Sequence, residues 1–415
     1  ITKGLSAKVQ GSWDTQSLFG EARYKMPELN EALKERNPNG TLSFEKIADE
    51  KNVTYSSAAW VWRKLYLEAN VNYDRTFGDH RVGGLLFYYI EDTSETGADK
   101  SMNAIPKRYQ SLSGRFTYGF KDTYFWDLNF GLNGSENFEP GKQYGFFPAG
   151  AFAWVPSSYE FMRENVSWLN FLKLRVSYGV VGNDRISSRR FPYLTLIKEE
   201  NASNPWGGTG SLTEEQVGAN NLMWEKAKKF DVGMDLKDKF TLTLDYFKDT
   251  RDGIFQERKQ IPDYVGLIQM PYGNIGRMKS WGADGNMEFY QQIGKDAHVI
   301  LRSNFTLSKN KILNWEDTKK PYTYLENNGY ANNVQRGFVA MGLFKDQQDV
   351  EMSPTQFGTV RPGDIKYRDI NGDGKITDDD KVPLFAYSGV PQLMYGIGAE
   401  FRYKSWTLNV LFKGT

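Results

Sequence analysis

A run of acidic, amide and glycine residues between Asp369 and Asp380 has the spacing of a calcium-binding loop. Such a loop takes oxygen ligands at positions one, three, five, seven, nine and twelve, and glycine at position six allows a sharp turn. The predicted ligands are Asp369, Asn371, Asp373, the carbonyl of Lys375, Thr377 (directly or through water) and Asp380. Aspartate at position twelve reaches less far than the usual glutamate, which would weaken affinity. We therefore predict a structural Ca²⁺ site, with an Asx-rich turn that binds nothing as the alternative.

The remaining residue types that could do chemistry do not form a catalytic pattern. The only histidines are His80 and His298, cysteine is absent, and no serine is spaced to pair with either histidine. Acidic pairs such as Glu199 and Glu200 are predicted to be solvated loop charges, and no phosphate-binding glycine loop of the Walker type occurs. We expect a protein that is not an enzyme.

Aromatic residues in predicted loops could stack on the apolar faces of sugar rings. The candidates for substrate contact are Trp206, Tyr322 and Tyr324. The alternative for all three is packing within the loops or contact with a partner protein.

Composition narrows the class of protein. The 415 residues include 52 Lys and Arg and 51 Asp and Glu, which gives a net charge of +1 and no reason to expect a nucleic-acid partner. Aromatic residues make up 15%, and there are 40 glycines. No run of 18 apolar residues occurs, which excludes a transmembrane helix but not spanning β-strands, because these alternate in polarity. The chain starts at Ile1 without a signal peptide, so we expect a processed product or a piece of a longer protein.

Apolar and polar residues alternate with period two over many segments, as they do in β-strands. Between Leu112 and Phe120, for example, Phe116 and Tyr118 share one face, and Arg115 and Thr117 share the other. The pattern returns over residues 124–132, 172–180, 230–236, 240–246, 299–307, 395–403 and 406–412. We predict roughly a dozen strands, several of them long enough, at about 9–11 residues, to cross a bilayer.

The connections between these strands are asymmetric. Tight turns are predicted at 77–79, 121–123, 237–239, 294–296 and 404–405, and long loops at 93–107, 182–222, 250–275 and 313–390. Aromatic residues flank the tight turns, as in an interfacial girdle: Phe77, Phe120, Tyr124, Phe240, Tyr403 and Trp406. Long loops on one side and tight turns on the other are typical of outer-membrane barrels. We therefore predict an all-β fold, part of an antiparallel transmembrane β-barrel, in preference to a soluble β-sandwich.

In such a barrel, the face opposite the apolar one lines the interior. The charged residues predicted to face inward include Arg115, Asp127, Lys173, Arg175 and Asp231. They would make the interior polar and wet.

An ordered series of motifs resembles the SusC/RagA group of TonB-dependent outer-membrane transporters, from near Lys64 to the last residue. The motifs are Asn133-Gly-Ser-Glu-Asn-Phe138, Gly145-Phe-Phe-Pro-Ala149, Trp154, Leu172-Lys-Leu-Arg-Val-Ser-Tyr-Gly-Val-Val-Gly-Asn183, Trp224-Glu-Lys, Asp249-Thr-Arg-Asp-Gly253, Asn274-Ile-Gly, Trp281-Gly282, Arg361-Pro-Gly-Asp-Ile-Lys-Tyr-Arg-Asp-Ile-Asn-Gly-Asp-Gly374 and Tyr395-Gly-Ile.

The resemblance implies an outer-membrane barrel of about 22 strands, plugged by an N-terminal domain, in a Gram-negative bacterium of the Bacteroidota. It implies import of oligosaccharides or peptides, energy from the TonB-ExbB-ExbD complex, and a SusD-like surface lipoprotein as a lid. Outer-membrane lipid would surround the barrel.

Two departures from the family pattern shape the expected domain organisation. No plug-like region or TonB box is found in the sequence, and about a dozen strands cannot close a barrel of that size. We expect residues 1–415 to be an incomplete barrel region from the C-terminal part of a transporter, with 313–390 as a long extracellular loop that carries the calcium-like segment 369–380. A surface or soluble calcium-stabilised protein that binds glycans without transport, and a passive porin, remain as alternatives.

Overall fold

The computed structural model describes residues 2–415 except 97–101, 103, 167–168, 186–189, 204–208, 333 and 386–389. The chain divides into two compact units. The first comprises residues 1–8, 70–88 and 111–415, and the second comprises residues 9–69 and 89–110. Each unit is described by itself.

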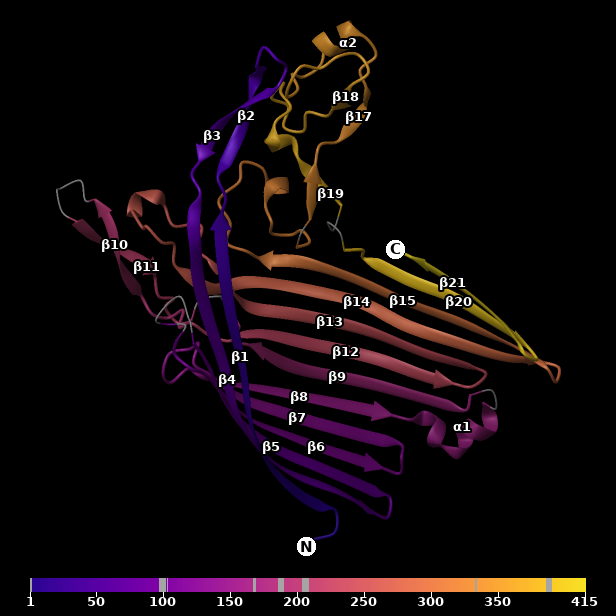
Figure 1. Ribbon diagram of the computed structural model, residues 1–415. Coiled ribbons are helices and arrows are strands. Elements are labelled where there is room, and N and C mark those ends of the chain that lie inside the picture. The colour runs from indigo at the N-terminus through magenta and orange to yellow at the C-terminus, as the bar shows by residue number, and fades with distance from the viewer. Residues whose placement is uncertain are drawn as a thin grey trace. The chain divides into compact units, whose positions relative to one another are not determined.

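The structure consists mainly of antiparallel strands, and most strands of the large sheet pair with the strand that precedes or follows them in that sheet along the chain (Figure 1). Thirteen strands form one sheet in the order β1-β4-β5-β6-β7-β8-β9-β12-β13-β14-β15-β20-β21. Their bounds are β1 Leu5–Met26, β4 Lys51–Phe77, β5 His80–Glu95, β6 Lys107–Phe120, β7 Tyr124–Ser135, β8 Tyr144–Trp154, β9 Phe171–Asn183, β12 Glu225–Lys237, β13 Phe240–Glu257, β14 Tyr272–Ile293, β15 Ala297–Asn314, β20 Leu393–Tyr403 and β21 Trp406–Gly414. The prediction of an all-β fold with about a dozen strands is confirmed.

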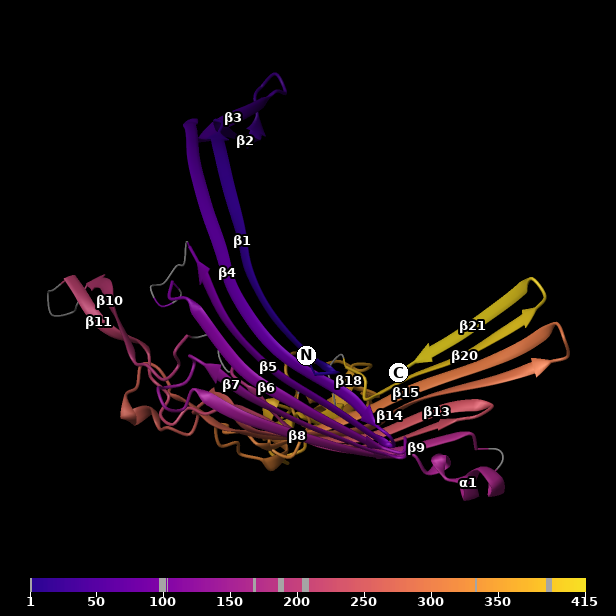
Figure 2. The same ribbon diagram turned by 90° about the horizontal axis from the view of Figure 1, so that it is seen from below.

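The five predicted tight turns join consecutive strands of the first unit. Backbone φ is positive at Lys121, Asp122, Gly294 and Lys404 in these turns, a conformation that lets a strand reverse within two or three residues. In Figure 2, the strands of this unit that belong to the large sheet lie side by side in a curved sheet: β6 to β9, β12 to β15, β20 and β21.

Strand register sorts the side chains of the first unit onto two faces. Leu236 opposes Leu242, which opposes Met287 on the next strand. The neighbouring positions on these strands carry Asp235, Thr243 and Asn286. We call the first set the apolar face and the second the polar face. Because period-two alternation recurs from strand to strand, each face continues across neighbouring strands of the sheet.

The predicted loop at 250–275 was wrong in its extent. β13 continues to Glu257 and β14 already begins at Tyr272, so the loop spans only 258–271. The register between the two strands shifts at Asp252, Ile254 and Phe255, which breaks the period-two alternation there and hid these residues from a search for it. An ion pair of 2.6 Å between Asp252 and Arg277 also joins the two strands in this region.

The second unit contains the long parts of β1 and β4 and a short hairpin that the sequence did not reveal. The hairpin strands are β2 (Leu29–Arg36) and β3 (Leu42–Ala48), which pair with each other. β4 alone has 27 residues, far more than the roughly 9–11 that cross a bilayer.

The long connection after β15 folds into small sheets of its own. β16 (Gln335–Gly337) pairs with β19 (Val382–Phe385), and β17 (Ala340–Leu343) pairs with β18 (Ile365–Tyr367). The other short elements are the β10–β11 hairpin (Leu196–Ser203 and Thr209–Gln216), α1 (Glu160–Asn165), α2 (Gln347–Glu351), η1 (Pro156–Ser158), η2 (Asp263–Val265), η3 (Thr323–Leu325) and η4 (Asp378–Asp380). Among the residues that the structure describes, no helix has the length and hydropathy to span a membrane.

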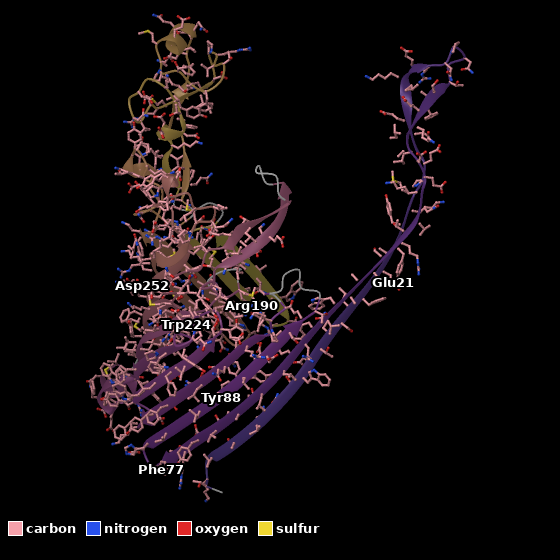
Figure 3. The ribbon with its side chains drawn as sticks, turned by 90° about the vertical axis from the view of Figure 1, so that its left-hand side faces the viewer. Glu21, Phe77, Tyr88, Arg190, Trp224 and Asp252 are labelled. Atoms are coloured by element: carbon pink, nitrogen blue, oxygen red, sulfur yellow. The ribbon has the colours of Figure 1, made fainter. Side chains whose placement is uncertain are left out.

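The tightest hydrophobic cluster of the first unit lies where the strands meet the long loops. Phe138 and Leu222 are almost completely buried, and Trp224 stacks on Phe138 with ring centroids 4.9 Å apart. Phe147 meets the same indole edge-on at 5.2 Å. Figure 3 labels Trp224 at this end of the sheet and Phe77 at the end with the tight turns. The cluster anchors the loops at the end of the strands.

Candidate functional site

The polar face of the first unit carries a network of ion pairs in its middle. The guanidinium of Arg175 on β9 contacts Asp235 on β12 at 3.2 Å and Asp245 on β13 at 2.8 Å. Arg115 on β6 forms a separate pair with Asp127 on β7, with Nε 3.1 Å from Oδ1. The predicted inward charges therefore share one face, and Arg175 bridges three strands.

A glycine makes room for the Arg175 network. A Cβ atom added to Gly233 would lie 2.2 Å from Oδ1 of Asp245 and 2.8 Å from Cζ of Arg175. Any side chain at this position would therefore displace the arginine or the carboxylate.

The same face is hollowed beside these pairs. A cavity of about 490 Å³ is lined by charged residues from six strands, namely Asp74, Arg81, Arg115, Asp127, Lys173, Arg175 and Asp231. Small side chains such as Ala151, Ala153 and Ser177 also line it, as do the larger apolar residues Phe125, Trp126, Phe152 and Val176. The cavity therefore offers charged groups together with apolar surface.

Sequence reasoning placed Arg175 and Asp231 on this face but missed Asp235 and Asp245. The alternation pattern itself indicated them, because Asp235 and Asp245 stand at positions of β12 and β13 whose side chains point to the same face as that of Asp231. What was missing was the register between β9, β12 and β13, which decides which carboxylates reach the guanidinium.

The calcium-like loop closes on itself through hydrogen bonds. The two carboxylate oxygens of Asp369 accept the backbone N–H groups of Gly372 at 2.7 Å and Gly374 at 2.8 Å. Oδ1 of Asp373 accepts the N–H of Lys375 at 2.8 Å, and the side-chain oxygen of Asn371 accepts the N–H of Asp373. The predicted ligands thus lie in one compact turn.

Asp380 is completely buried beneath this turn. Its Oδ1 accepts the N–H of Ile370 at 2.8 Å, and its Oδ2 accepts the N–H of Thr377 at 2.7 Å. Burial alone would raise the pKa of Asp380, but these backbone donors and Asn371 outweigh it and hold the pKa below its usual value. Asp380 is therefore an ionised carboxylate that ties the two ends of the loop together.

The donor set fits a cation only in part. Each carboxylate oxygen has a second lone pair that a hard cation could use, and the predicted ligands are all oxygens, as Ca²⁺ prefers. Thr377 instead caps η4, with its hydroxyl accepting the N–H of Asp379. In the described part of the chain, no group of three or more His, Cys, Asp or Glu side chains is arranged to hold a metal ion. Calcium binding stays a prediction.

The predicted aromatic contacts lie beside this loop. Tyr322 and Tyr324 stack with ring centroids 5.3 Å apart and planes 8° from parallel. The hydroxyl of Tyr324 donates to the carbonyl of Asp379 at 2.7 Å. Burial raises the pKa of Tyr324, and Tyr322 and the acidic loop add to the effect. Tyr324 thus braces the loop, and Trp206 lies outside the described residues.

The two histidines lie near the tight turns, away from the acidic loop in sequence. Nδ1 of His80 lies 2.7 Å from the hydroxyl of Tyr118. The ring of His298 packs on Tyr290 with centroids 5.5 Å apart. Each histidine ring thus lies beside a tyrosine, as expected for the band of aromatic residues predicted near the tight turns.

Comparison with known proteins gives one consistent picture. The family model "TonB dependent receptor-like, beta-barrel" matches residues 3–415. TonB-dependent receptor P3 of Formosa agariphila is 23% identical over 420 residues, which cover 91% of this chain and 41% of the relative. TonB-dependent receptor P26 of the same bacterium is 29% identical over 343 residues, covering 77% of this chain and 33% of the relative.

Solved structures agree on the fold. The RagAB peptide importer in its closed-closed state matches all of this chain and 46% of the solved chain, with a TM-score of 0.69 and 19% identity. The structure of the RagAB peptide transporter matches 99% of this chain with a TM-score of 0.70 and 18% identity.

The chain spans less than half the length of the relatives it matches. The family match nevertheless begins at residue 3, whereas the motifs indicated a resemblance only from near Lys64. The chain belongs to the TonB-dependent receptor β-barrel family.

Proposed function

We propose that this chain is part of the barrel wall of a TonB-energised importer in the outer membrane of a Gram-negative bacterium. The single observation that carries the proposal is the family match over residues 3–415. The family consists of outer-membrane transporters rather than enzymes, and the curated relatives bear the name TonB-dependent receptor.

The two faces of the sheet support this assignment. Trp126, Leu128 and Phe116 on the apolar face are each about half exposed, with values of 48%, 51% and 46%. Such a surface is unfavourable in water but suits lipid. The polar face, with Arg175 and its carboxylates, suits a water-filled or plugged interior. A soluble glycan-binding protein would need to cover the apolar face, so the importer is the better account.

For the substrate, we propose a bulky polar nutrient, either a peptide or an oligosaccharide. The charged hollow on the polar face favours contacts with charged groups, such as those that peptides carry. The solved RagAB structures are described as a peptide importer.

For partners, we propose a SusD-like surface lipoprotein as a lid and the TonB-ExbB-ExbD complex as the source of energy. Two long loops leave the sheet at the end opposite the tight turns. They are 184–224, which carries the β10–β11 hairpin, and 315–392, which carries the small sheets β16–β19 and β17–β18. This end would face the cell exterior and meet the lid.

The experiment is an uptake assay in the source bacterium with the gene intact, deleted, or restored. Cells are given fluorescent peptides or fluorescent oligosaccharides of matched size, with and without an uncoupler that abolishes TonB energy. If deletion abolishes the uptake of one substrate class, and the uncoupler abolishes that uptake in intact cells, the proposal is supported and the substrate class is identified. Energy-independent uptake would instead identify a passive porin, and unchanged uptake of both classes would overturn import.

A tagged full-length protein, purified from the outer membrane of the same cells, tests the lid. A lipoprotein that co-purifies in equal amount is the expected result. A receptor that purifies alone, while still importing its substrate, would contradict the lid.

A further inference from the structure

Positive charges gather on the apolar-face side of β12–β15, just beyond the last apolar residues. The register aligns these positions in rungs across the four strands. A rung is the set of four residues, one from each strand, that oppose one another. The last apolar rung consists of Val232, Tyr246, Ala283 and Leu307. Toward the loops follow three further rungs: first Phe230, Lys248, Trp281 and Lys309; second Lys228, Thr250, Lys279 and Lys311; third Lys226, Asp252, Arg277 and Asn314. We call Lys226, Lys228, Lys248, Arg277, Lys279, Lys309 and Lys311 the basic belt.

The belt is not neutralised by its own strands. The three rungs hold seven cationic side chains and one carboxylate, Asp252. Asp252 pairs with Lys228 at 3.0 Å and with Arg277 at 2.6 Å. Within the described part of the chain, no ion pair holds Lys248 or Lys309, and both are exposed. Because strands lie about 4.8 Å apart and alternate residues about 7 Å apart along a strand, the belt forms a dense patch with a large excess of positive charge.

The position of the belt matches a membrane interface. It begins where the apolar band ends, and Tyr246 and Trp281 stand at that border, as aromatic residues do at the level of lipid headgroups. The ammonium of Lys279 lies 5.0 Å from the centroid of the Trp281 ring. Figure 3 places Asp252 at the loop end of the sheet, away from Phe77 at the tight turns. The belt therefore lies toward the loop end of the strands, which under the proposed function faces the cell exterior.

A hollow of about 330 Å³ opens beside the belt. Lys309 and Lys311 line it together with Trp281, and Val334, Leu384 and Phe385 from the long loop complete it. Cationic and apolar walls in one hollow suit a ligand that has both an anionic and an apolar part.

We propose that the basic belt binds phosphate groups of lipid headgroups in the outer leaflet of the membrane. A protein partner with an acidic surface is less well matched, because the belt continues the lipid-facing surface of the strands without a break. Lysine side chains at such a border can extend along the apolar surface and place their charge at headgroup level. The inference relies on the outer-membrane placement under Proposed function, but not on the substrate or on transport.

The test is native mass spectrometry of the full-length protein in detergent, titrated with lipid A that carries its phosphate or with the same lipid dephosphorylated. The wild type should retain the phosphorylated lipid, less so at high salt, and only weakly the dephosphorylated one. The variant Lys248→Gln/Lys279→Gln/Lys309→Gln removes three belt charges, and we expect its affinity to fall at least tenfold, since each cation near an anionic lipid surface contributes on the order of 1 kcal/mol.

The matched control is Lys237→Gln/Lys239→Gln/Lys295→Gln, which removes the same charge near the tight turns of the same strands. It should keep wild-type lipid retention. Equal retention of both lipids by the wild type, or equal loss in both triple variants, would overturn the inference. Competition by millimolar inorganic phosphate without a lipid requirement would also overturn it, as a site for free phosphate.

Folding is checked by the shift of each variant on electrophoresis between unheated and heated samples. If the belt variant fails to fold, the inference is tested on the wild type alone, by the effect of salt on lipid retention and by the comparison of phosphorylated with dephosphorylated lipid. A belt variant that retains lipid but loses a co-purifying lipoprotein would identify a protein interface instead. Normal retention of lipid by the wild type, in cells whose substrate uptake does not change when the gene is deleted, would count against the proposed transport and leave the belt intact.

Discussion

Arg175 neutralises two carboxylates of the polar face at once. It contacts Asp235 and Asp245 from the two following strands, and Asp231 lies one rung away on the same face. Its side chain is one-third exposed, so water screens the charges only in part. Without the guanidinium, two close carboxylates would remain with no cation between them.

We expect Arg175→Gln to lower the free energy of unfolding by roughly 1–3 kcal/mol, between the values typical of exposed and of buried pairs. The matched change Arg115→Gln removes an arginine that is more exposed and that pairs, among the described residues, with Asp127 alone, and it should cost less than about 1 kcal/mol. Urea titration of the protein folded in lipid vesicles measures both. Equal losses would show that Arg175 does not serve as the hub of the network.

The acidic loop offers a test at single residues of whether calcium or hydrogen bonds hold it. Asp369→Ala/Asp373→Ala removes two predicted ligands and the acceptors for Gly372, Gly374 and Lys375. We expect limited proteolysis to cut the loop at 313–390 in this variant, while insertion into the membrane is unchanged. In the wild type, a chelator should expose the same cleavage sites if Ca²⁺ holds the loop.

The control is Asp378→Ala, whose carboxylate is largely exposed and pairs with Lys381. It should leave cleavage unchanged. If the wild type is cut identically with and without chelator, and added Ca²⁺ releases no heat in calorimetry, the hydrogen bonds around Asp380 are sufficient and the calcium prediction is wrong.

At the scale of elements, each strand of the first unit has to satisfy two environments at once. β6 shows this within three residues, because Phe116 is exposed on the apolar face while Arg115 and Thr117 lie on the polar face. In lipid, all backbone groups of such a strand must pair with neighbouring strands, and β6 lies between β5 and β7 in the sheet.

Phe116→Lys should therefore destabilise the folded protein by roughly 2–4 kcal/mol, the cost of a lysine facing mid-membrane. Thr117→Lys, one position along and on the polar face, should change stability much less. Folding yield and urea titration in vesicles measure both variants. If the two lysines cost the same, the face that carries Phe116 does not meet lipid.

Alternation of apolar and polar residues was sufficient to predict β6, β7, β9 and β12, because apolar side chains occupy nearly every second position of these strands. It failed for the outer part of β4, where the run from Ser56 to Ala59 is small and nearly uniform in polarity. It also could not find the small sheets, since β16 pairs with β19 and their residues stand almost 50 apart in sequence. Local patterns define the faces of a strand, whereas pairing partners and ion networks such as that of Arg175 depend on register between strands.

At the scale of the whole molecule, the 13-stranded sheet has two ends, β1 and β21. Within the described part of the chain, each of these strands pairs on one side only. β1 has 22 residues, so a long row of backbone N–H and C=O groups would face lipid without partners. Each such group costs several kcal/mol in hydrocarbon, which makes an open sheet untenable in a bilayer.

We therefore expect residues 1–415, expressed alone and folded into vesicles, to give no compact form that resists SDS and unfolds on heating. The native polypeptide from the outer membrane of the source cells should give such a form, at an intact mass well above 47.6 kDa, because further strands would pair with β1 and β21. A compact, heat-sensitive form of residues 1–415 alone would mean that the two edges find partners in this chain or in a second copy of it. The mass of that form would separate the two cases, since pairing between copies doubles it and pairing within one chain leaves it unchanged.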